Sequence, residues 1–331
     1  MTAMQSPPGL RLGRLSDWMD SALPGLRQGA LVAQPISGGF SNLTYRLTDG
    51  VSIWVLRRPP LGHLLPSAHD MAREFRIISA LAPTEVPVPT PVAFCGDEDI
   101  TGARFYLMNY VEGQVVSEHD LPAMMTTEEL RELYDQMVDA LVLIHQVDPT
   151  QVGLGDLGRP QGFLRRQVNR WSAQWAASQT RSLPDLDLTV DLLLKGLPDR
   201  SVATIVHGDF RIGNLIFSRA GNAVVAVVDW EMATLGDPLA DLGLLVAYHR
   251  QATDDRIPST DYLTGRYADA AGVDVSDIGW FVAFGIFKLA VISEGIHHRY
   301  LAGQTVGDGF HQIGATVPSL LASAVATLQR K

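Results

Sequence analysis

Cysteine is almost absent from this 331-residue chain, which contains only Cys95. A lone cysteine excludes an internal disulfide and a metal site built from several thiolates. Nothing in the surrounding sequence suggests a catalytic thiol, so we interpret Cys95 as a residue of a half-buried strand.

Basic residues are also few. The chain has 26 Lys and Arg against 36 Asp and Glu, which gives a formal net charge of -10. Because contacts with a nucleic-acid backbone need clustered Lys and Arg, this balance argues against general nucleic-acid binding. An acidic surface is compatible with a cationic substrate, but it is also the usual state of soluble cytoplasmic proteins, and we give that interpretation more weight.

Long apolar segments are missing as well. The longest apolar run, residues 281–292, is too short to cross a bilayer and contains Lys288. Residues 1–15 contain no apolar segment typical of a signal peptide. We therefore expect a cytoplasmic protein without a membrane partner; the sequence indicates no particular oligomeric state. The length is sufficient for two lobes with substantial cores.

The most informative stretch is H-G-D-F-R-I-G-N at 207–214, followed by an apolar, β-branched run at 223–228 that ends in Asp229. The run predicts a buried strand. A carboxylate at the end of a buried strand needs a partner, because an unpaired charge in apolar surroundings is costly. We therefore expect Asp229 to meet a cation.

Three side chains of this stretch form a candidate catalytic set. Asn214 and Asp229 supply the neutral and charged oxygen ligands that Mg²⁺ takes in proteins. Asp209 is then left free to accept or orient a proton. The alternative is a turn between two strands with a capping Asp and a turn Asn, which leaves the second aspartate without a role.

This stretch resembles the catalytic centre of the aminoglycoside phosphotransferases and choline kinase-like proteins, which are relatives of the protein kinases. Their motif is H-G-D-x-x-x-x-N followed by a strand ending in I/V-D-[WFL], and the sequence matches it in residue type and spacing. Protein kinases carry H-R-D with the same spacing from Asp to Asn. The resemblance implies a bilobal, protein-kinase-like α+β fold: a nucleotide-binding lobe with an antiparallel sheet at 1–111, a hinge at about 109–113, and a larger, mainly helical lobe at 112–331.

A loop with two glycines, Ser37-Gly38-Gly39-Phe40-Ser41-Asn42, lies between two expected strands. Its backbone N–H groups can approach phosphates, although such glycine pairs often only turn the chain. The resemblance implies that this loop covers the nucleotide phosphates. It also assigns Asn109, Tyr110 and Val111 to the hinge, whose backbone contacts the base of ATP or GTP.

A cation follows on the next expected strand. Kinases place a lysine there and pair it with a glutamate of the following helix; the matching residue here is Arg57, whose forked guanidinium can also hold phosphate. The helical period of the apolar residues predicts an amphipathic helix at 69–82. Glu74, on this helix, is the candidate partner of Arg57. A surface pair of Glu74 with Arg73 or Arg76 is an alternative of equal weight.

The resemblance also implies roles around the catalytic segment. Arg211 matches the place where protein kinases carry a lysine that touches the transferring phosphate. His207 braces the loop, and Asp241, in the D-P-x-x-D-L motif, buttresses it by accepting hydrogen bonds. Because the C-terminal helices shape the acceptor pocket in this family, the candidate acceptor contacts are Glu231, Trp280, Glu294 and Arg299.

The acceptor is suggested by a second, less specific similarity. The segment LRRPPLGHLLPSAHDMAREF at 56–75 looks most like the branch related to the kinase-like domains of acyl-CoA dehydrogenase fusion proteins. That branch suggests a hydroxyacyl metabolite, and the helix carrying Arg165, Arg166 and Arg170 either receives an anion or presents an ordinary solvated basic face. An aminoglycoside acceptor would instead need several carboxylates to meet its ammonium groups.

The resemblance thus implies a phosphotransferase that uses ATP or GTP with Mg²⁺ to phosphorylate a hydroxyl of a small molecule. This reaction needs mainly positioning and neutralisation of charge, which the residues named above can supply. One alternative is a catalytically silent nucleotide-binding pseudokinase, which the arginine at position 57 favours. The other is a metal-dependent hydrolase that uses His207, Asp209 and Asp229.

Overall fold

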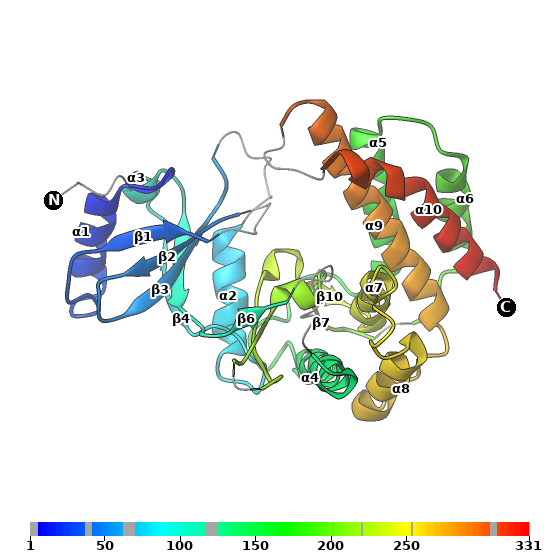
Figure 1. The fold of residues 1–331 in the computed structure, drawn as a ribbon, viewed down its shortest axis with the longest axis horizontal. Helices are drawn as coiled ribbons and strands as arrows, with labels where there is room; N and C mark the ends of the chain where they lie inside the picture. The colour runs from blue at the N-terminus through cyan, green and yellow to red at the C-terminus, as the bar shows by residue number, and fades with distance from the viewer. Residues whose placement is uncertain are drawn as a thin grey trace. The chain divides into compact units, whose positions relative to one another are not determined.

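The computed structural model describes residues 6–36, 42–61, 70–116, 125–200, 202–219, 221–252, 254–304 and 310–330. The chain divides into two compact units, one formed by Met1–Gln114 with Val225–Glu231 and the other by Val115–Val224 with Met232–Lys331. The predicted α+β, protein-kinase-like architecture with two lobes is confirmed (Figure 1). The first unit is nevertheless discontinuous, since a short segment from the middle of the chain returns to it. The predicted phosphate loop at Ser37–Ser41 lies outside the described residues.

The first unit is built on a five-stranded antiparallel sheet with the order β1-β2-β3-β5-β4. Its strands are β1 (Val32–Pro35), β2 (Leu43–Thr48), β3 (Ile53–Arg58), β4 (Pro91–Cys95) and β5 (Phe105–Asn109). Three helices accompany the sheet, α1 (Leu12–Ala22), α2 (Met71–Leu81) and α3 (Glu98–Thr101).

Alternation along the strands assigns side chains to the two faces of this sheet. On one face, buried residues such as Leu56 and Leu107 join a hydrophobic cluster with Leu15 and Met19 of α1. The next residues along these strands, Arg57 and Tyr106, stand opposite each other in the register and point to the other face, where both bond to Glu74 of α2. Helix α2 lies against this sheet (Figure 1). The period of two therefore directs the charge of Arg57 toward α2.

The boundary between the units runs through two short strands, β6 (Gln114–Val115) and β9 (Val224–Val227). The backbone N–H of Val227 donates to the carbonyl of Pro87 over 2.7 Å. This bond fastens the end of β9 to the first unit and so determines where Asp229 lies.

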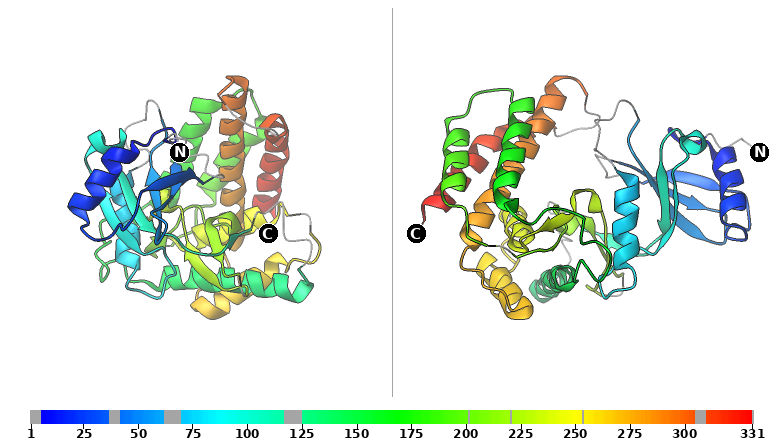
Figure 2. Two further views of the ribbon diagram at one scale, coloured as in Figure 1. Left: turned by 60° about the vertical axis from the view of Figure 1, so that its left-hand side comes forward. Right: turned by 180° about the vertical axis from the view of Figure 1, so that it is seen from behind.

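The second unit is mainly helical (Figure 2). Its helices are α4 (Thr127–Gln146), α5 (Phe163–Ser178), α6 (Pro184–Lys195), α7 (Leu239–His249), α8 (Thr260–Ala271), α9 (Ile278–Leu301) and α10 (Phe310–Gln329). Its short strands are β7 (Thr204–Val206), which pairs antiparallel with β10 (Thr234–Gly236), and β8 (Leu215–Phe217). The 3₁₀ turn η1 (Ile212–Asn214) forms the end of the 207–214 stretch, and a second 3₁₀ turn, η2 (Trp230–Met232), follows Asp229.

Helix α9 is the central helix of the second unit. It packs against both α7 and α10 (Figures 1 and 2). Among the described residues it is the one helix long and apolar enough to cross a bilayer, but 72% of its apolar window is buried inside the protein. We therefore interpret its apolar character as that of a core helix.

Candidate active site

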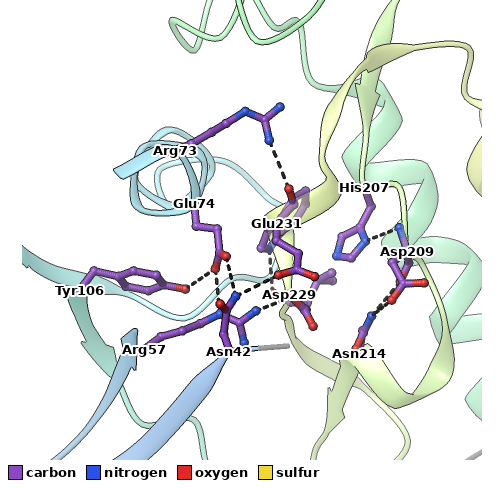
Figure 3. A network of polar contacts seen from close by, with 12 residues as sticks. Asn42, Arg57, Arg73, Glu74, Tyr106, His207, Asp209, Asn214, Asp229 and Glu231 are labelled. Carbon is purple, nitrogen blue, oxygen red and sulfur yellow. Dashed lines mark hydrogen bonds and ion pairs between the residues drawn. The ribbon is translucent and has the colours of Figure 1, made fainter. Parts of the chain in front are cut away.

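Arg57 joins three elements of the first unit. Its Nε donates to Oε2 of Glu74 on α2 over 2.8 Å, and its Nη2 donates to Oδ1 of Asp229, which follows β9 (Figure 3). The phenol of Tyr106 donates to the same Glu74 oxygen over 3.0 Å. The predicted pair of Arg57 and Glu74 is present, and Asp229 has the cationic partner that its place at the end of a buried strand required. Arg73, the alternative partner of Glu74, donates instead to the backbone carbonyl of Glu231.

Asn42 and Glu231 complete this network. The Asn42 amide donates to Oε1 of Glu74 over 3.2 Å and to Oε2 of Glu231 over 2.9 Å (Figure 3). Asn42 was predicted as the last residue of the phosphate loop, yet its side chain holds two carboxylates together. Glu231 was predicted to contact the acceptor, and here its carboxylate belongs to the Arg57 network of the first unit.

Three carboxylates around one guanidinium leave a surplus of negative charge. Burial, reinforced by Asp229 and Glu231, raises the pKa of Glu74 to about 7 although Arg57 acts in the opposite direction. Burial by itself lowers the pKa of Arg57, but Glu74 and Asp229 together hold that pKa above its ordinary value, so the guanidinium stays charged. A site with such a surplus is suited to a cation.

Asp229 has the only positive φ among the described non-glycine residues, at 69°. This left-handed conformation is uncommon for residues with a side chain and is tolerated best by Asn and Asp. Arg57 takes one of its carboxylate oxygens, and 28% of the side chain remains exposed. A carboxylate oxygen is therefore available as a hard ligand for Mg²⁺, so the residue fits that ion.

In the second unit, both oxygens of the Asp209 carboxylate have a neutral donor. The Tyr248 hydroxyl from α7 donates to Oδ1 over 3.2 Å. The Asn214 amide donates to Oδ2 over 3.1 Å and to the Asp209 carbonyl over 2.8 Å (Figure 3). With its nitrogen engaged, Asn214 keeps its amide oxygen as a possible metal ligand. Asn214, with its amide oxygen, belongs to the second unit, and Asp229, with its carboxylate, belongs to the first.

His207 and Asp241 brace the loop at 207–214, as predicted. His207 is fully buried, and its Nδ1 accepts the backbone N–H of Asp209 over 3.2 Å. Asp241 accepts the backbone N–H groups of His207 over 2.6 Å and of Gly208 over 2.8 Å. Burial raises the pKa of Asp241, but His145 at 3.3 Å and these N–H groups hold it below its usual value. Asp241 is therefore an anionic anchor and not a proton carrier.

The remaining predicted residues near the catalytic motif and the hinge are Arg211, Asn109, Tyr110 and Val111. The Arg211 guanidinium lies 5.1 Å from the centre of the Tyr248 ring, beside Asp209. In the first unit, Asn109 ends β5, and the Tyr110 N–H donates to the Ile53 carbonyl over 3.3 Å. Val111 follows, half-buried.

Two of the three predicted acceptor contacts on α9, Glu294 and Trp280, have structural roles instead. Glu294 is fully buried and accepts the backbone N–H and hydroxyl of Thr180 together with Arg181, so it fastens the segment after α5. Trp280 is 8% exposed and donates to the Leu193 carbonyl over 3.1 Å, which makes it a packing residue. Arg299 is exposed in the last turn of α9.

Sequence reasoning missed two residues that bond to the 207–214 loop, Tyr248 and Lys288. Together with Gln167, Arg170 and Trp171 of α5, Lys288 lines a cavity against Gly208 that has about 30 Å³ of space for water. The signal for Lys288 was present, since it is a charge inside an apolar run. Tyr248 offered no such signal, because a tyrosine on a helix usually packs in the core.

The described residues contain no group of three or more His, Cys, Asp or Glu side chains arranged to hold a metal ion. The hydrolase alternative required such a set from His207, Asp209 and Asp229. The ring of His207 is instead committed to the backbone of its own loop.

A known protein family and several relatives match most of this chain. The model of the phosphotransferase enzyme family matches residues 32–272. Acyl-CoA dehydrogenase family member 11 from Gallus gallus is 33% identical over 329 residues, covering 93% of this chain and 42% of that protein. The chain therefore spans less than half of this relative. The predicted similarity to the kinase-like part of acyl-CoA dehydrogenase fusion proteins is confirmed.

Solved structures show the same fold. A candidate aminoglycoside phosphotransferase from Ralstonia eutropha superposes with a TM-score of 0.84 at 31% identity, covering 96% of this chain and 98% of that one. A thermostable mutant of aminoglycoside phosphotransferase APH(4)-Ia, solved with AMP-PNP and hygromycin B, has a TM-score of 0.66 at 15% identity, covering 96% of this chain and 99% of that one. At that identity the second likeness concerns the fold alone.

Proposed function

The chain belongs to the phosphotransferase enzyme family, and we propose that it transfers the γ-phosphoryl group of ATP or GTP to a hydroxyl of a small molecule. The observation that carries this proposal is the Asp209 carboxylate, which is held at both oxygens by neutral donors beside Arg211. A carboxylate fixed in this way is suited to accept a proton from a hydroxyl. We also expect the protein to act in the cytoplasm.

The nucleotide would be bound mainly by the first unit. Arg57 is permanently charged, and with the Ser37–Asn42 loop it would hold the phosphates, while Asn109–Val111 would meet the base. The availability of oxygen ligands on Asn214 and Asp229 supports their assignment to Mg²⁺. When bound, this ion supplies neutralisation of the phosphate charge.

The chemical step needs little from the chain beyond positioning. The acceptor hydroxyl would donate its hydrogen bond, and then its proton, to Asp209. The acceptor oxygen forms the new bond to the γ-phosphorus as the bond to the leaving nucleoside diphosphate breaks. Arg211 would stabilise charge on the transferring group.

The surroundings of the loop favour an anionic acceptor over an aminoglycoside. The cavity beside Gly208 is lined by two basic side chains, Arg170 and Lys288, and its one carboxylate, Asp241, is already bonded to backbone N–H groups. The cavity has room for little more than one water, but its positive charge would disfavour a polycationic acceptor bound near the loop. A hydroxyacyl metabolite fits this charge and the similarity to acyl-CoA dehydrogenase family proteins; the dehydrogenase activity itself is not implied for this chain.

The test replaces Asp209. Mg-ATP turnover would be followed with a panel of hydroxy acids, hydroxyacyl-CoA thioesters and aminoglycosides. Asp209→Ala should abolish transfer, since the proton acceptor is lost, whereas titration calorimetry should still detect Mg-ATP binding. Turnover by this variant close to that of the unchanged protein would refute the assignment.

The two alternatives give different results in the same experiments. A pseudokinase would bind Mg-ATP but phosphorylate no member of the panel. A metal-dependent hydrolase would be stabilised in thermal unfolding by Zn²⁺ or Mn²⁺ without nucleotide, because a ligand that binds the folded state raises its stability.

A further inference from the structure

Lys288 is a buried charge in the middle of the central helix. The chain has only three lysines, Lys195, Lys288 and Lys331. Lys288 is 5% exposed and has apolar neighbours along α9. Burying an ammonium group costs free energy unless strong partners replace its hydration. A residue kept at such a cost calls for a functional explanation.

The partners of Lys288 are a carbonyl and an aromatic ring. Its Nζ donates to the backbone carbonyl of Gly208 and lies 5.0 Å from the centre of the Trp171 ring on α5. It forms no ion pair with any described residue. Burial lowers the pKa of Lys288 and Arg170 acts in the same direction, while Asp209 and Asp241 oppose both.

Gly208 is the residue whose backbone orients Asp209. Its φ is +83°, and a side chain there would place Cβ 2.5 Å from the Met232 carbonyl, so glycine is required. The N–H of Gly208 is bound by Asp241 from α7, and its carbonyl is bound by Lys288 from α9. That carbonyl belongs to the peptide bond that joins Gly208 to Asp209. Two helices therefore hold the turn from opposite ends of one residue.

We propose that Lys288 is a positioning residue, which fixes the Gly208–Asp209 peptide and thereby the catalytic carboxylate. The catalytic part of this inference rests on the proposed function. Its structural part does not, because the loop and its anchors exist whatever the reaction is.

A methionine at this position separates positioning from stability. Met has nearly the length of Lys but no charge, so Lys288→Met removes the donor and the desolvation cost together. We expect an unchanged or higher melting temperature and about tenfold faster amide exchange at residues 207–214, since the loop opens locally more often. Lys195→Met removes an exposed lysine of α6. It should change neither the melting temperature nor the amide exchange at residues 207–214.

Two outcomes would overturn the proposal. If exchange at 207–214 in Lys288→Met equals that of the unchanged protein, the lysine does not hold the loop. If the melting temperature falls and exchange accelerates throughout the second unit, Lys288 is a core residue without a specific link to Asp209. Lys288→Arg keeps a charged donor, and it should recover part of the loop protection.

Activity provides the second readout. In Lys288→Met we expect kcat to fall about tenfold with the KM for Mg-ATP unchanged, because the lysine acts on Asp209 and not on the nucleotide. An unchanged kcat alongside faster loop exchange would overturn the catalytic part. If the unchanged protein transfers no phosphate to any acceptor, the proposed function fails, while amide exchange still decides whether Lys288 positions the loop.

Discussion

A general base needs a lone pair that points in a fixed direction. Asp209, which we propose as the base, meets this need because its two oxygens are held by different elements. Asn214 comes from the turn η1 of the same loop, while Tyr248 comes from α7. Burial, followed by the charge of Asp209, raises the pKa of Tyr248 above its ordinary value, so the phenol remains a donor over any practical pH range. The loop alone would leave one oxygen unrestrained.

Removing that phenol tests how much orientation contributes. Tyr248→Phe keeps the ring beneath Arg211 and deletes one hydrogen bond to a carboxylate, an interaction of about 1.5–3 kcal/mol. We expect kcat to fall about tenfold with little change in the KM for Mg-ATP. Steady-state kinetics measure both. Tyr262→Phe on α8, which loses a comparable bond to Asp135, is the matched control; equal effects in the two variants would contradict an orienting role.

The Glu74 carboxyl predicts a pH dependence of stability. Its pKa is about 7 in the folded state and 4.5 in an unperturbed chain, so between these values the folded state binds the extra proton. The free energy of unfolding should therefore fall as pH rises from about 4.5 to 7. Denaturant titrations should give a loss on the order of 1–3 kcal/mol. Glu74→Gln should flatten this part of the curve, and a slope as steep as before would refute the explanation.

At the scale of elements, regular patterns in the sequence were the reliable guide. The helical period at 69–82 predicted α2, which the structure has at Met71–Leu81, and the alternation of β3 placed Arg57 on the face toward that helix. Lys288 and Tyr248 lie in the lobe that the sequence predicted to be mainly helical, yet their roles depend on which loop each helix packs against. That choice is tertiary, and helical periodicity does not contain it.

The contact of α7 with α9 is close enough to depend on a missing side chain. A Cβ at Gly243 would lie 2.4 Å from the backbone of Phe281, whereas one at Gly265 of α8 would meet nothing within 4 Å. Gly243→Ala should cost about 1–3 kcal/mol of unfolding free energy through overpacking. Gly265→Ala should instead stabilise by about 0.5–1 kcal/mol, because alanine favours helix. Thermal unfolding of both variants checks this, and equal shifts would contradict the close crossing.

At the scale of the whole molecule, the sequence predicted a single boundary between two lobes near residue 111. In the structure a second, later segment also belongs to the first unit. The segment Val225–Glu231 lies in the sequence between parts of the second unit but belongs to the first unit. There Asp229 bonds to Arg57, and Glu231 is linked to Glu74 through Asn42. The apolar character of β9 was visible in the sequence, but its hydrogen bond to Pro87 was not, since nothing local specifies the partner of a short strand. The first unit is therefore completed by residues synthesised about a hundred positions later.

That discontinuity makes a prediction about a fragment. Residues 1–114 contain all five strands of the main sheet and its hydrophobic cluster, so we expect the fragment to fold. It lacks Asp229 and Glu231, which raise the pKa of Glu74 in the intact chain. The pKa of Glu74, measured by carbon NMR of its carboxyl group, should therefore be lower in the fragment. Appending residues 225–231 through a flexible linker should raise it again, because the segment carries both carboxylates and the Val227 N–H that binds the Pro87 carbonyl. A folded fragment whose Glu74 titrates as in the whole protein would show that burial alone controls this carboxyl and that the returning segment has no electrostatic part in the site.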